Sequence, residues 1–348
     1  MIRSSMAGDL ILVTGGTEFI GFHILLCALR AGYTVRAAVP DSAAFDRIYS
    51  LDVIEHYRSR LTSFIVPNNT APGAYDAAVR GVKFVIHSSP LPAQNAVAAD
   101  DYEGSVIRPA IQETLNVLEA VHRASGIKRV VITESIASIA NIFKPTETPI
   151  NESTRTAITS GPYPDMLTAY SSAKAQTHRA TWDFITNRTP SFDVVNILPV
   201  FVIGRDDGIT AAEEHNRGSN ILLVKPLLGE GYPTIPVPTP GVTVDIHDVA
   251  KMHVKALNPD VPGNEDYIAS ADPNGGYTWE DLVDIIKTRY PEQYNRGMFK
   301  IDDAPRRTTQ PCYIDSSKAE DAFGMAFRTF EEGVVEAIDQ YLELLGIH

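Results

Sequence analysis

The chain has 348 residues, of which 44% are hydrophobic and 21% charged, and this composition predicts a globular protein with one large domain or two coupled ones. Its formal net charge is −13, with no block of Lys or Arg to offset it, which argues against nucleic acid or an anionic membrane surface as a partner. The two cysteines lie outside any C-x-x-C pattern, which argues against a disulfide framework or a zinc site.

The sequence reaches its first expected strand at Leu10 without the apolar run of a signal peptide. No later apolar run is long enough to span a membrane. We therefore expect a cytoplasmic protein with no membrane association, present as a monomer or a homodimer.

The first half of the chain alternates between strand and helix patterns. The expected strands are Leu10–Thr14, Thr34–Val39, Phe84–His87 and Arg129–Thr133, and the expected helices are Phe19–Arg30 and Pro109–Ala124. The second of these helices has Pro at its start and Gly126 just beyond its end. This alternation predicts an α/β fold with a Rossmann-like, doubly wound parallel sheet.

Two segments interrupt the alternation. Residues 141–167 are rich in Pro, Thr and Ser and predict a long loop, while 232–241 contains four prolines and predicts a connector. Residues 244–257 then resume a strand followed by a helix. Three capping-box patterns follow, which are Thr278-x-x-Asp281, Ser317-x-x-Glu320 and Thr329-x-x-Glu332. We expect a Rossmann lobe of residues 1–200 plus 241–262 and a smaller substrate lobe of residues 201–240 plus 263–348.

The segment LILVTGGTEFIGFHILL, from Leu10 to Leu26, has the strand–turn–helix order of a dinucleotide-binding site. Gly15 is expected to make the tight turn and Gly21 to let the helix approach the sheet, with the free N–H groups of the helix facing a pyrophosphate. Glu18 stands at the middle position, where Gly would allow the closest approach, so its side chain must turn outward. The alternative is a glycine-rich turn that binds no ligand. The cofactor is favoured because this is the first strand-to-helix turn of the fold.

Tyr170 and Lys174 lie four residues apart in the segment YSSAK, which predicts that they share one face of a helix. The ammonium of Lys174 would favour the phenolate and lower the pKa of the tyrosine from its usual value of about 10. Tyr170 could then give a proton to a carbonyl oxygen, or take one from an alcohol. This spacing alone is more typical of a solvated helix face.

Ser135 follows the expected strand Arg129–Thr133 and lies near its carboxyl end, where ligands bind in such sheets. A hydroxyl at this position can hydrogen-bond a substrate carbonyl. A serine at a strand end is usually only a turn residue, so its role depends on Tyr170 and Lys174.

These motifs together resemble the extended short-chain dehydrogenase/reductases, and within them the branch of dihydroflavonol reductases, cinnamoyl-CoA reductases and fungal aldehyde and ketone reductases. The resemblance runs nearly end to end and is carried by VTGGTEFIG, GYTVRAAV, PGAYDAAVRGVKFVIHSSP, ETLNVLEAV, KRVVITES, AYSSAK, NILPVFVIG and VDIHDVAKMHVKAL. It implies an NADPH-dependent carbonyl reductase with Ser135, Tyr170 and Lys174 as its catalytic triad, and Lys174 would also hold the nicotinamide ribose.

The resemblance also implies a set of cofactor contacts, in which 87–90 passes beneath the cofactor and 199–202 borders the nicotinamide. The expected cofactor-binding residues are Gly15, Thr17, Phe19, Ile20, Gly21, Arg36, Arg47, Asn68, His87, Ser88, Ser89, Tyr170, Lys174, Pro199 and Val202. Loop positions suggest an apolar pocket for a hydrophobic or aromatic carbonyl compound. Its expected lining is Leu91, Phe143, Tyr163, Phe201, Leu222 and Tyr232.

The chain departs from this branch at Glu18 and at three further positions. Pro40 stands where an Arg usually pairs with the 2′-phosphate of NADPH, and Asn68 stands where an Asp usually contacts adenine. Glu134 replaces a small residue beside the catalytic Ser. The loss at Pro40 removes a charge-assisted contact.

Arg47, at the start of the next helix, or Arg36 could supply the charge that Pro40 lacks. An acid that would select NADH is absent from the strand end unless Asp41 serves, so NADPH is favoured and NADH stays open. The weakened cofactor positions leave one alternative, a non-redox protein of this fold such as a dehydratase, a cyclase or a binding protein. Neither a GxSxG motif nor a clustered set of histidines is present, so no serine-hydrolase or metal site is expected.

Overall fold

The structure is a computed structural model that describes residues 8–89, 101–145, 148–215, 217–231, 238–271 and 277–347. Contacts divide the chain into two units. The first comprises residues 1–140, 154–198 and 250–267, and the second comprises 141–153, 199–249 and 268–348. Residues 241–249 are thereby grouped with the second unit, whereas the sequence suggested the first. No helix in the described part of the chain combines the length and the hydrophobicity needed to cross a membrane.

The first unit is built on a seven-stranded sheet with the order β10-β6-β5-β4-β1-β2-β3. Its strands are β1 (Leu10–Thr14), β2 (Thr34–Val39), β3 (Leu61–Ile65), β4 (Phe84–Ser88), β5 (Arg129–Thr133), β6 (Asp193–Pro199) and β10 (Glu265–Ala269). All pairings from β6 to β3 are parallel. The predicted doubly wound parallel sheet is confirmed, and the four predicted strands are confirmed to within one residue.

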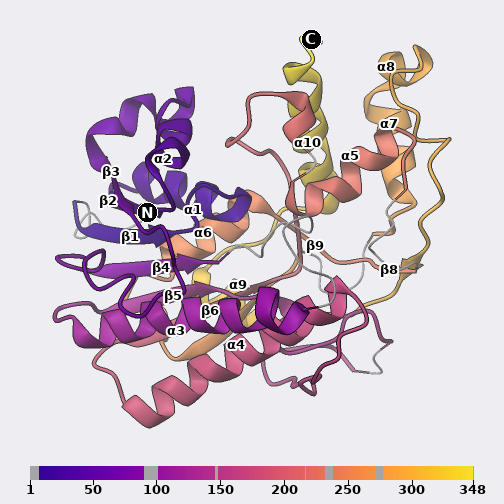
Figure 1. The fold of residues 1–348 in the computed structure, drawn as a ribbon. Helices are drawn as coiled ribbons and strands as arrows, with labels where there is room; N and C mark the ends of the chain where they lie inside the picture. Colours follow the sequence, from indigo (N-terminus) through magenta and orange to yellow (C-terminus); the bar gives the residue numbers. More distant parts are fainter. Residues whose placement is uncertain are drawn as a thin grey trace. The chain divides into compact units, whose positions relative to one another are not determined.

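Helices cover both faces of this sheet (Figure 1). The helices of the unit are α1 (Phe19–Arg30), α2 (Ser42–Tyr49), α3 (Arg108–Arg123) and α4 (Met166–Arg188). The steps from β1 to β2 and from β4 to β5 run in opposite directions along the sheet, so right-handed crossovers place α1 and α3 on opposite faces. Under α3 and α4 the core contains Val85, Val130, Val117 and Phe184.

Local sequence explains where α3 and α4 begin. A π-helical turn, Glu103–Ile107, leads into α3, and Pro109 occupies its first turn, where the missing N–H costs nothing. Helix α4 begins at Met166 because the Asp165 carboxylate accepts a hydrogen bond from the Thr168 N–H at 2.7 Å. Tyr170 therefore lies in the second turn of α4 rather than at its start. The described residues between 141 and 165 contain a single isolated bridge, at Ile150, which confirms the long loop.

The second unit contains short strands and helices around its own apolar core. Its elements are β7 (Phe201–Ile203), α5 (Ile221–Leu227), β8 (Thr239–Pro240), β9 (Thr243–Asp245), α7 (Asp281–Arg289), α8 (Pro291–Asn295), β11 (Thr309–Gln310), α9 (Ser317–Phe323) and α10 (Phe330–Leu344). Helix α6 (Ile246–Lys255) continues from this unit into the first. The core packs Leu222, Trp279, Ile286, Phe330 and Val334.

The three predicted capping boxes have three different outcomes. Thr329 and Glu332 form a complete box at α10. At α7 only half of the box forms, because Asp281 accepts from the Thr278 N–H while the helix begins at Asp281 itself. The prediction for α9 is wrong, because Ser317 already belongs to the helix and its hydroxyl donates to Asp315.

Candidate functional site

The turn between β1 and α1 is shaped to admit phosphate. Gly15 has φ +64°, in the left-handed region that favours glycine. A Cβ on Gly21 would lie 2.1 Å from the Gly15 carbonyl oxygen, so no larger residue fits there without moving the turn. No side chain caps α1, which leaves the N–H groups of its first turn available to an anion. Glu18 is exposed, consistent with the outward orientation that phosphate binding requires.

The sheet order makes this turn the topological switch point. From β1 the chain proceeds to β2 on one side, and later to β4 on the other. In open α/β sheets ligands bind outside the carboxyl ends of the strands at such a point. The residues that end there are Thr14, Ser88 and Thr133. Of the expected contacts on α1, Phe19 is buried, while Thr17 and Ile20 are half-buried at its entrance.

Helix α4 brings Lys174 to the carboxyl end of β5. The Lys174 Nζ donates a hydrogen bond to the Thr133 carbonyl oxygen at 3.1 Å, and the side chain is almost buried. Tyr170 lies one turn earlier on the same helix and is half-buried. Ser135, two residues beyond Thr133, is buried, and its Oγ accepts from the Ala137 N–H at 3.2 Å. The prediction that Tyr170 and Lys174 lie one turn apart on the same helix is thus confirmed.

Glu134 lies between Thr133 and Ser135, and its side chain is fully buried. Its Oε2 accepts a hydrogen bond from Ser138 Oγ at 2.9 Å and lies 3.9 Å from the Lys174 Nζ. Burial raises the pKa of this carboxyl, and the nearby Lys174 charge opposes the rise. The sequence marked Glu134 only as a departure and gave no sign of its contact with Lys174.

His87 lies on β4, one residue before the carboxyl end of that strand. Its Nδ1 is 2.7 Å from Thr14 Oγ1 and its Nε2 is 3.1 Å from Thr114 Oγ1, and the ring is fully buried. Burial lowers the pKa of His87 to about 4, so the ring is neutral at physiological pH. Ser88 is also buried. Ser89 is half-buried, and its hydroxyl donates to Glu113 at 2.7 Å.

The expected adenine contact, Asn68, is exposed, whereas Arg36, an expected phosphate contact, is half-buried. Asn68 follows β3, and its side-chain oxygen accepts from the N–H and the hydroxyl of Thr70 at 3.1 and 2.7 Å. Arg36 lies in the middle of β2, and its guanidinium donates to the carbonyl oxygens of Ala78 and Arg80 at 2.6 and 2.8 Å. One guanidinium nitrogen of Arg36 is therefore used to hold the 73–81 turn against the sheet.

Helix α2 follows the strand end where Pro40 stands. Asp41 is its N-cap, and the Asp41 Oδ1 accepts from the Ala44 N–H at 2.8 Å. Arg47 is exposed and lies in the last turn of this short helix, not at its start as the sequence suggested. The sequence estimate failed because α2 begins at Ser42, directly after its Asp41 cap, and is only eight residues long.

The remaining predicted contacts lie in different parts of the chain. Tyr163 is half-buried in the first unit. In the second unit the Phe201 ring packs edge-on against Phe143 and Trp279, while Val202 and Leu222 are buried in the interior. Leu222 also lines a cleft of about 340 Å³ between α5 and α7. Pro199 ends β6, and Leu91 and Tyr232 lie outside the described residues.

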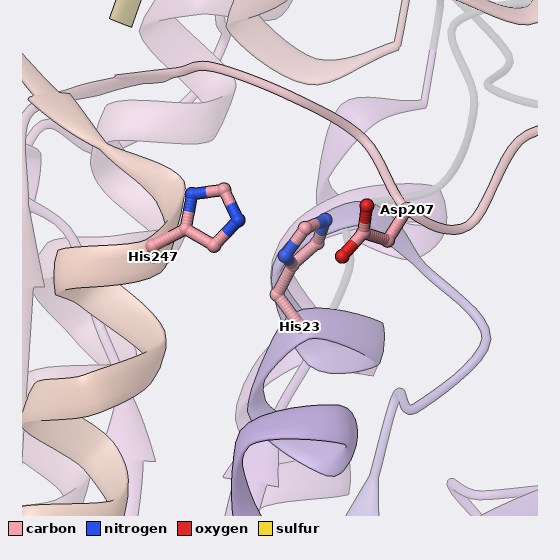
Figure 2. A group of neighbouring side chains, drawn as sticks. All are labelled: His23, Asp207 and His247. Atoms are coloured by element: carbon pink, nitrogen blue, oxygen red, sulfur yellow. The ribbon is translucent and has the colours of Figure 1, made fainter. Parts of the chain in front are cut away.

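Three of the histidines, His23, His247 and His253, contact neighbouring side chains of the fold. His23 projects from α1 (Figure 2) and packs edge-on against Phe19 and Phe22. His253 is buried, with its Nε2 2.8 Å from Thr133 Oγ1. His247, in the first turn of α6, lies 3.1 Å from Asp245 and 3.4 Å from Glu336.

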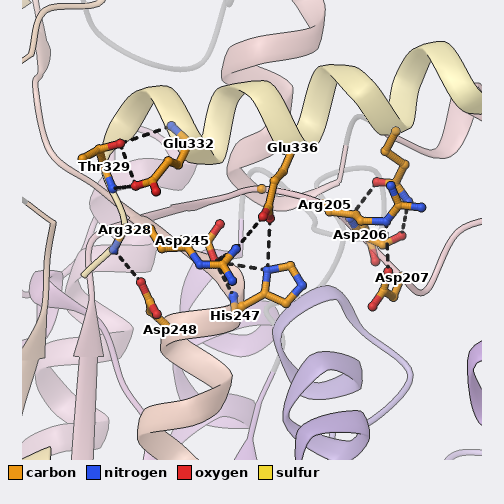
Figure 3. A network of polar contacts seen from close by, with 12 residues as sticks. Arg205, Asp206, Asp207, Asp245, His247, Asp248, Arg328, Thr329, Glu332 and Glu336 are labelled. Atoms are coloured by element: carbon orange, nitrogen blue, oxygen red, sulfur yellow. Dashed lines mark hydrogen bonds and ion pairs between the residues drawn. The ribbon is translucent and has the colours of Figure 1, made fainter. Parts of the chain in front are cut away.

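Asp245, His247 and Glu336 are close enough together to hold a cation. However, the Arg328 guanidinium lies 2.6 Å from Glu336 and 3.7 Å from Asp245 (Figure 3), so both carboxylates already have a positive partner. Burial lowers the pKa of His247, but Asp245 and Glu336 outweigh that effect and raise it. The group is best described as an ion-pair network.

Comparison with known proteins agrees with this geometry. Residues 11–269 match the model of the NAD dependent epimerase/dehydratase family. The ketoreductase CTB6 of Cercospora nicotianae is 32% identical, over 97% of this chain and 96% of its own. The ketoreductase sphI of Aspergillus fumigatus is 29% identical, over 98% of this chain and 100% of its own.

Among solved structures, Gre2 from Candida albicans in complex with NADPH superimposes with a TM-score of 0.80 at 24% identity, and the match covers 97% of this chain and 99% of that one. This likeness supports the fold. The family match covers most of the chain, including the switch-point turn, β5 and α4. The chain belongs to the NAD dependent epimerase/dehydratase family, within the extended short-chain dehydrogenase/reductases, and is an NAD(P)-dependent oxidoreductase.

Proposed function

We propose that this enzyme is an NADPH-dependent carbonyl reductase that acts on an aldehyde or ketone group of a hydrophobic small molecule. The observation that carries the proposal is the hydrogen bond from Lys174 to the Thr133 carbonyl oxygen. That bond holds the helix face carrying Tyr170 and Lys174 at the strand end that carries Ser135. The ketoreductase names of the two relatives support the same reaction class.

Each of the three side chains has a distinct task in this reaction. The Ser135 hydroxyl donates a hydrogen bond to the substrate carbonyl and orients it. The Tyr170 hydroxyl gives its proton to the carbonyl oxygen as the negative charge develops there. Lys174 keeps a positive charge beside that hydroxyl and holds the ribose of the cofactor. The bound nicotinamide cofactor supplies the hydride.

The residues around the switch-point turn fit a dinucleotide. The uncapped N-terminus of α1 and the space kept by Gly15 and Gly21 would accept the pyrophosphate. We favour NADPH because Arg47 is an exposed cation on α2, the helix that follows the strand end where the 2′-phosphate contact is expected. The NADPH complex of the Gre2 structure is in keeping with this choice.

The cofactor proposal is tested by titrating the purified protein with NADPH and with NADH and following the reduced-nicotinamide fluorescence. We expect saturable NADPH binding below 1 mM, with NADH weaker. If neither dinucleotide binds, the reductase proposal is wrong and the non-redox alternative of the same fold is favoured.

The proton-donor role is tested with Tyr170→Phe. Loss of a positioned general acid typically costs roughly 10²- to 10⁴-fold, so we expect kcat to fall by about that factor while NADPH affinity is nearly unchanged. Tyr267→Phe is a matched control, because its hydroxyl donates to the Pro262 carbonyl in the same unit. Unchanged turnover in Tyr170→Phe would remove Tyr170 from the mechanism.

A further inference from the structure

Glu134 is a buried acid in an unusual position, directly before Ser135 at the end of β5. Its side chain has no exposed surface. Oε2 accepts one hydrogen bond from Ser138, whereas Oε1 is buried without a hydrogen-bond partner among the described residues. A buried carboxylate that is only partly satisfied is costly unless a cation lies close by. The negative charge of the buried Glu134 carboxylate therefore requires a nearby positive charge.

The compensating cation is Lys174. Its Nζ lies 3.9 Å from Glu134 Oε2, and within the described ranges Glu134 is the one carboxylate that forms an ion pair with this ammonium. An ammonium has three N–H donors, and the Thr133 carbonyl oxygen takes one of them at 3.1 Å. The backbone of β5 and the side chain that follows it thus hold the same ammonium from adjacent positions.

We propose that Glu134 is a positioning residue, which fixes the Lys174 ammonium at the carboxyl end of β5 through their 3.9 Å ion pair. The inference rests on the proposed reductase function, in which Lys174 acts on Tyr170 and the cofactor ribose. Glu134 acts through Lys174 rather than on the reacting atoms. Its carboxylate supplies a counter-charge to an ammonium that is nearly buried.

Four groups on three elements face Glu134, and they determine how its charge varies with pH. Lys174 and His178 come from α4, Asp266 comes from β10, and Ser138 follows β5. Asp266 is itself paired, with its Oδ2 2.9 Å from His178 Nε2. Burial raises the pKa of Glu134 more strongly than any one neighbour lowers it, so the carboxyl ionises above the usual glutamate range of about 4.3. The pair with Lys174 is therefore complete only at higher pH.

The pairing itself can be measured in the cofactor-free protein with a double-mutant cycle of Glu134→Gln and Lys174→Met. Each single variant leaves one buried charge unpaired, whereas the double variant leaves none. We expect the loss of Tm in the double variant to be smaller than the sum of the single losses by about 3 °C or more. A cycle of Glu152→Gln with Lys174→Met is the control and should be additive, because Glu152 accepts from the Ile268 N–H instead.

The catalytic consequence is a pH-dependent effect on kcat. At acidic pH the protonated Glu134 resembles Gln, so wild type and Glu134→Gln should turn over at similar rates. As pH rises and Glu134 ionises, the ratio of wild-type to variant kcat should grow to roughly tenfold or more, because only wild type then carries a negative charge 3.9 Å from the Lys174 Nζ. Glu134→Asp keeps the charge and should recover most of the loss, and Glu152→Gln should follow the wild-type profile.

The outcomes separate this inference from the proposed function. An additive cycle, or a kcat ratio that is constant with pH, would overturn the role of Glu134 even if Tyr170→Phe abolishes reduction. A Glu134→Gln variant that retains the wild-type pH profile gives such a constant ratio, and the group that titrates would then be one other than Glu134. A non-additive cycle in a protein without carbonyl reductase activity would leave the pairing standing and reject the reductase.

Discussion

The two ends of the proposed cofactor site, both in the first unit, are built from different kinds of contact. At the chemistry end, Ser135, Glu134 and Lys174 are buried. Ser135 and Lys174 hydrogen-bond to backbone atoms of β5 and its continuation, and the Glu134 carboxylate is held by Ser138 and Lys174. At the phosphate and adenine end, Glu18, Asn68 and Arg47 are exposed, and the Asn68 side chain contacts the nearby Thr70. A change at the first end disturbs a packed network, while the second end can change cofactor preference with little effect on the fold.

The turn at Gly15 and Gly21 belongs to the phosphate end, but it is as tightly packed as the chemistry end. Of the variants outside the catalytic residues, Gly21→Ala should therefore have the largest effect on NADPH affinity. The added Cβ would lie 2.1 Å from the Gly15 carbonyl oxygen, and backbone has to shift to admit it. Overpacking of this kind costs about 1–3 kcal/mol, so NADPH affinity should fall roughly tenfold or more while kcat at saturating NADPH stays near wild type.

Gly16→Ala is the matched control in the same turn. Its Cβ would meet the end of the Leu25 side chain at 3.0 Å, and a side chain can rotate away where a carbonyl cannot. Fluorescence titration and initial rates at several NADPH concentrations distinguish the two variants. Equal affinity in Gly21→Ala and wild type would show that the turn does not carry the cofactor phosphate.

The elements that carry the proposed chemistry end were predictable because their signals are local. The strand Arg129–Thr133 contains three consecutive β-branched apolar residues, Ser135 follows within two residues, and the spacing of Tyr170 and Lys174 requires only a helix. The doubly wound parallel sheet follows from the alternation of strands and helices, whereas its strand order comes from the structure. The strand–turn–helix at Gly15 is equally local, and the structure has its strand and helix at the predicted residues.

What the sequence could not supply is the direction of long side chains. Arg36 looked available for a phosphate, yet it donates to Ala78 and Arg80, more than forty residues away in the chain. Glu134 looked like an odd neighbour of Ser135, and only the packing of α4 on β5 shows it beside Lys174. The ring of His87 is likewise enclosed by Thr14 and Thr114 from two other elements. Each of these depends on tertiary contacts that no local pattern encodes.

Arg47→Ala should have an intermediate effect, because it tests whether α2 supplies the charge that Pro40 lacks. An exposed charge on a phosphate is worth about 1 kcal/mol, so we expect NADPH affinity to fall roughly fivefold while NADH affinity is unchanged. The measurement is the ratio of the two dissociation constants at low salt, where screening is weakest.

Arg36→Ala is the contrasting variant at this end. Since its guanidinium holds the carbonyl oxygens of Ala78 and Arg80, its loss should lower Tm with the NADPH-to-NADH ratio unchanged. If the NADPH-to-NADH ratio shifts in Arg36→Ala and not in Arg47→Ala, the residue that contacts the 2′-phosphate is Arg36 on β2 and not Arg47 on α2.

Glu18→Gly should have the smallest effect, although it restores the glycine that dinucleotide turns usually carry. Glu18 is exposed and caps nothing with its side chain, so its charge is screened by solvent and its removal relieves little repulsion. We expect NADPH affinity to rise less than about threefold, with Glu18→Gln giving most of that rise because the change is electrostatic. A gain above tenfold in Glu18→Gly but not in Glu18→Gln would mean that the side chain obstructs the phosphate sterically. The turn that holds the phosphate would then be tightly packed at Glu18 as well as at Gly21. Only the residues expected near the adenine and the 2′-phosphate would remain as the loosely packed end of the site.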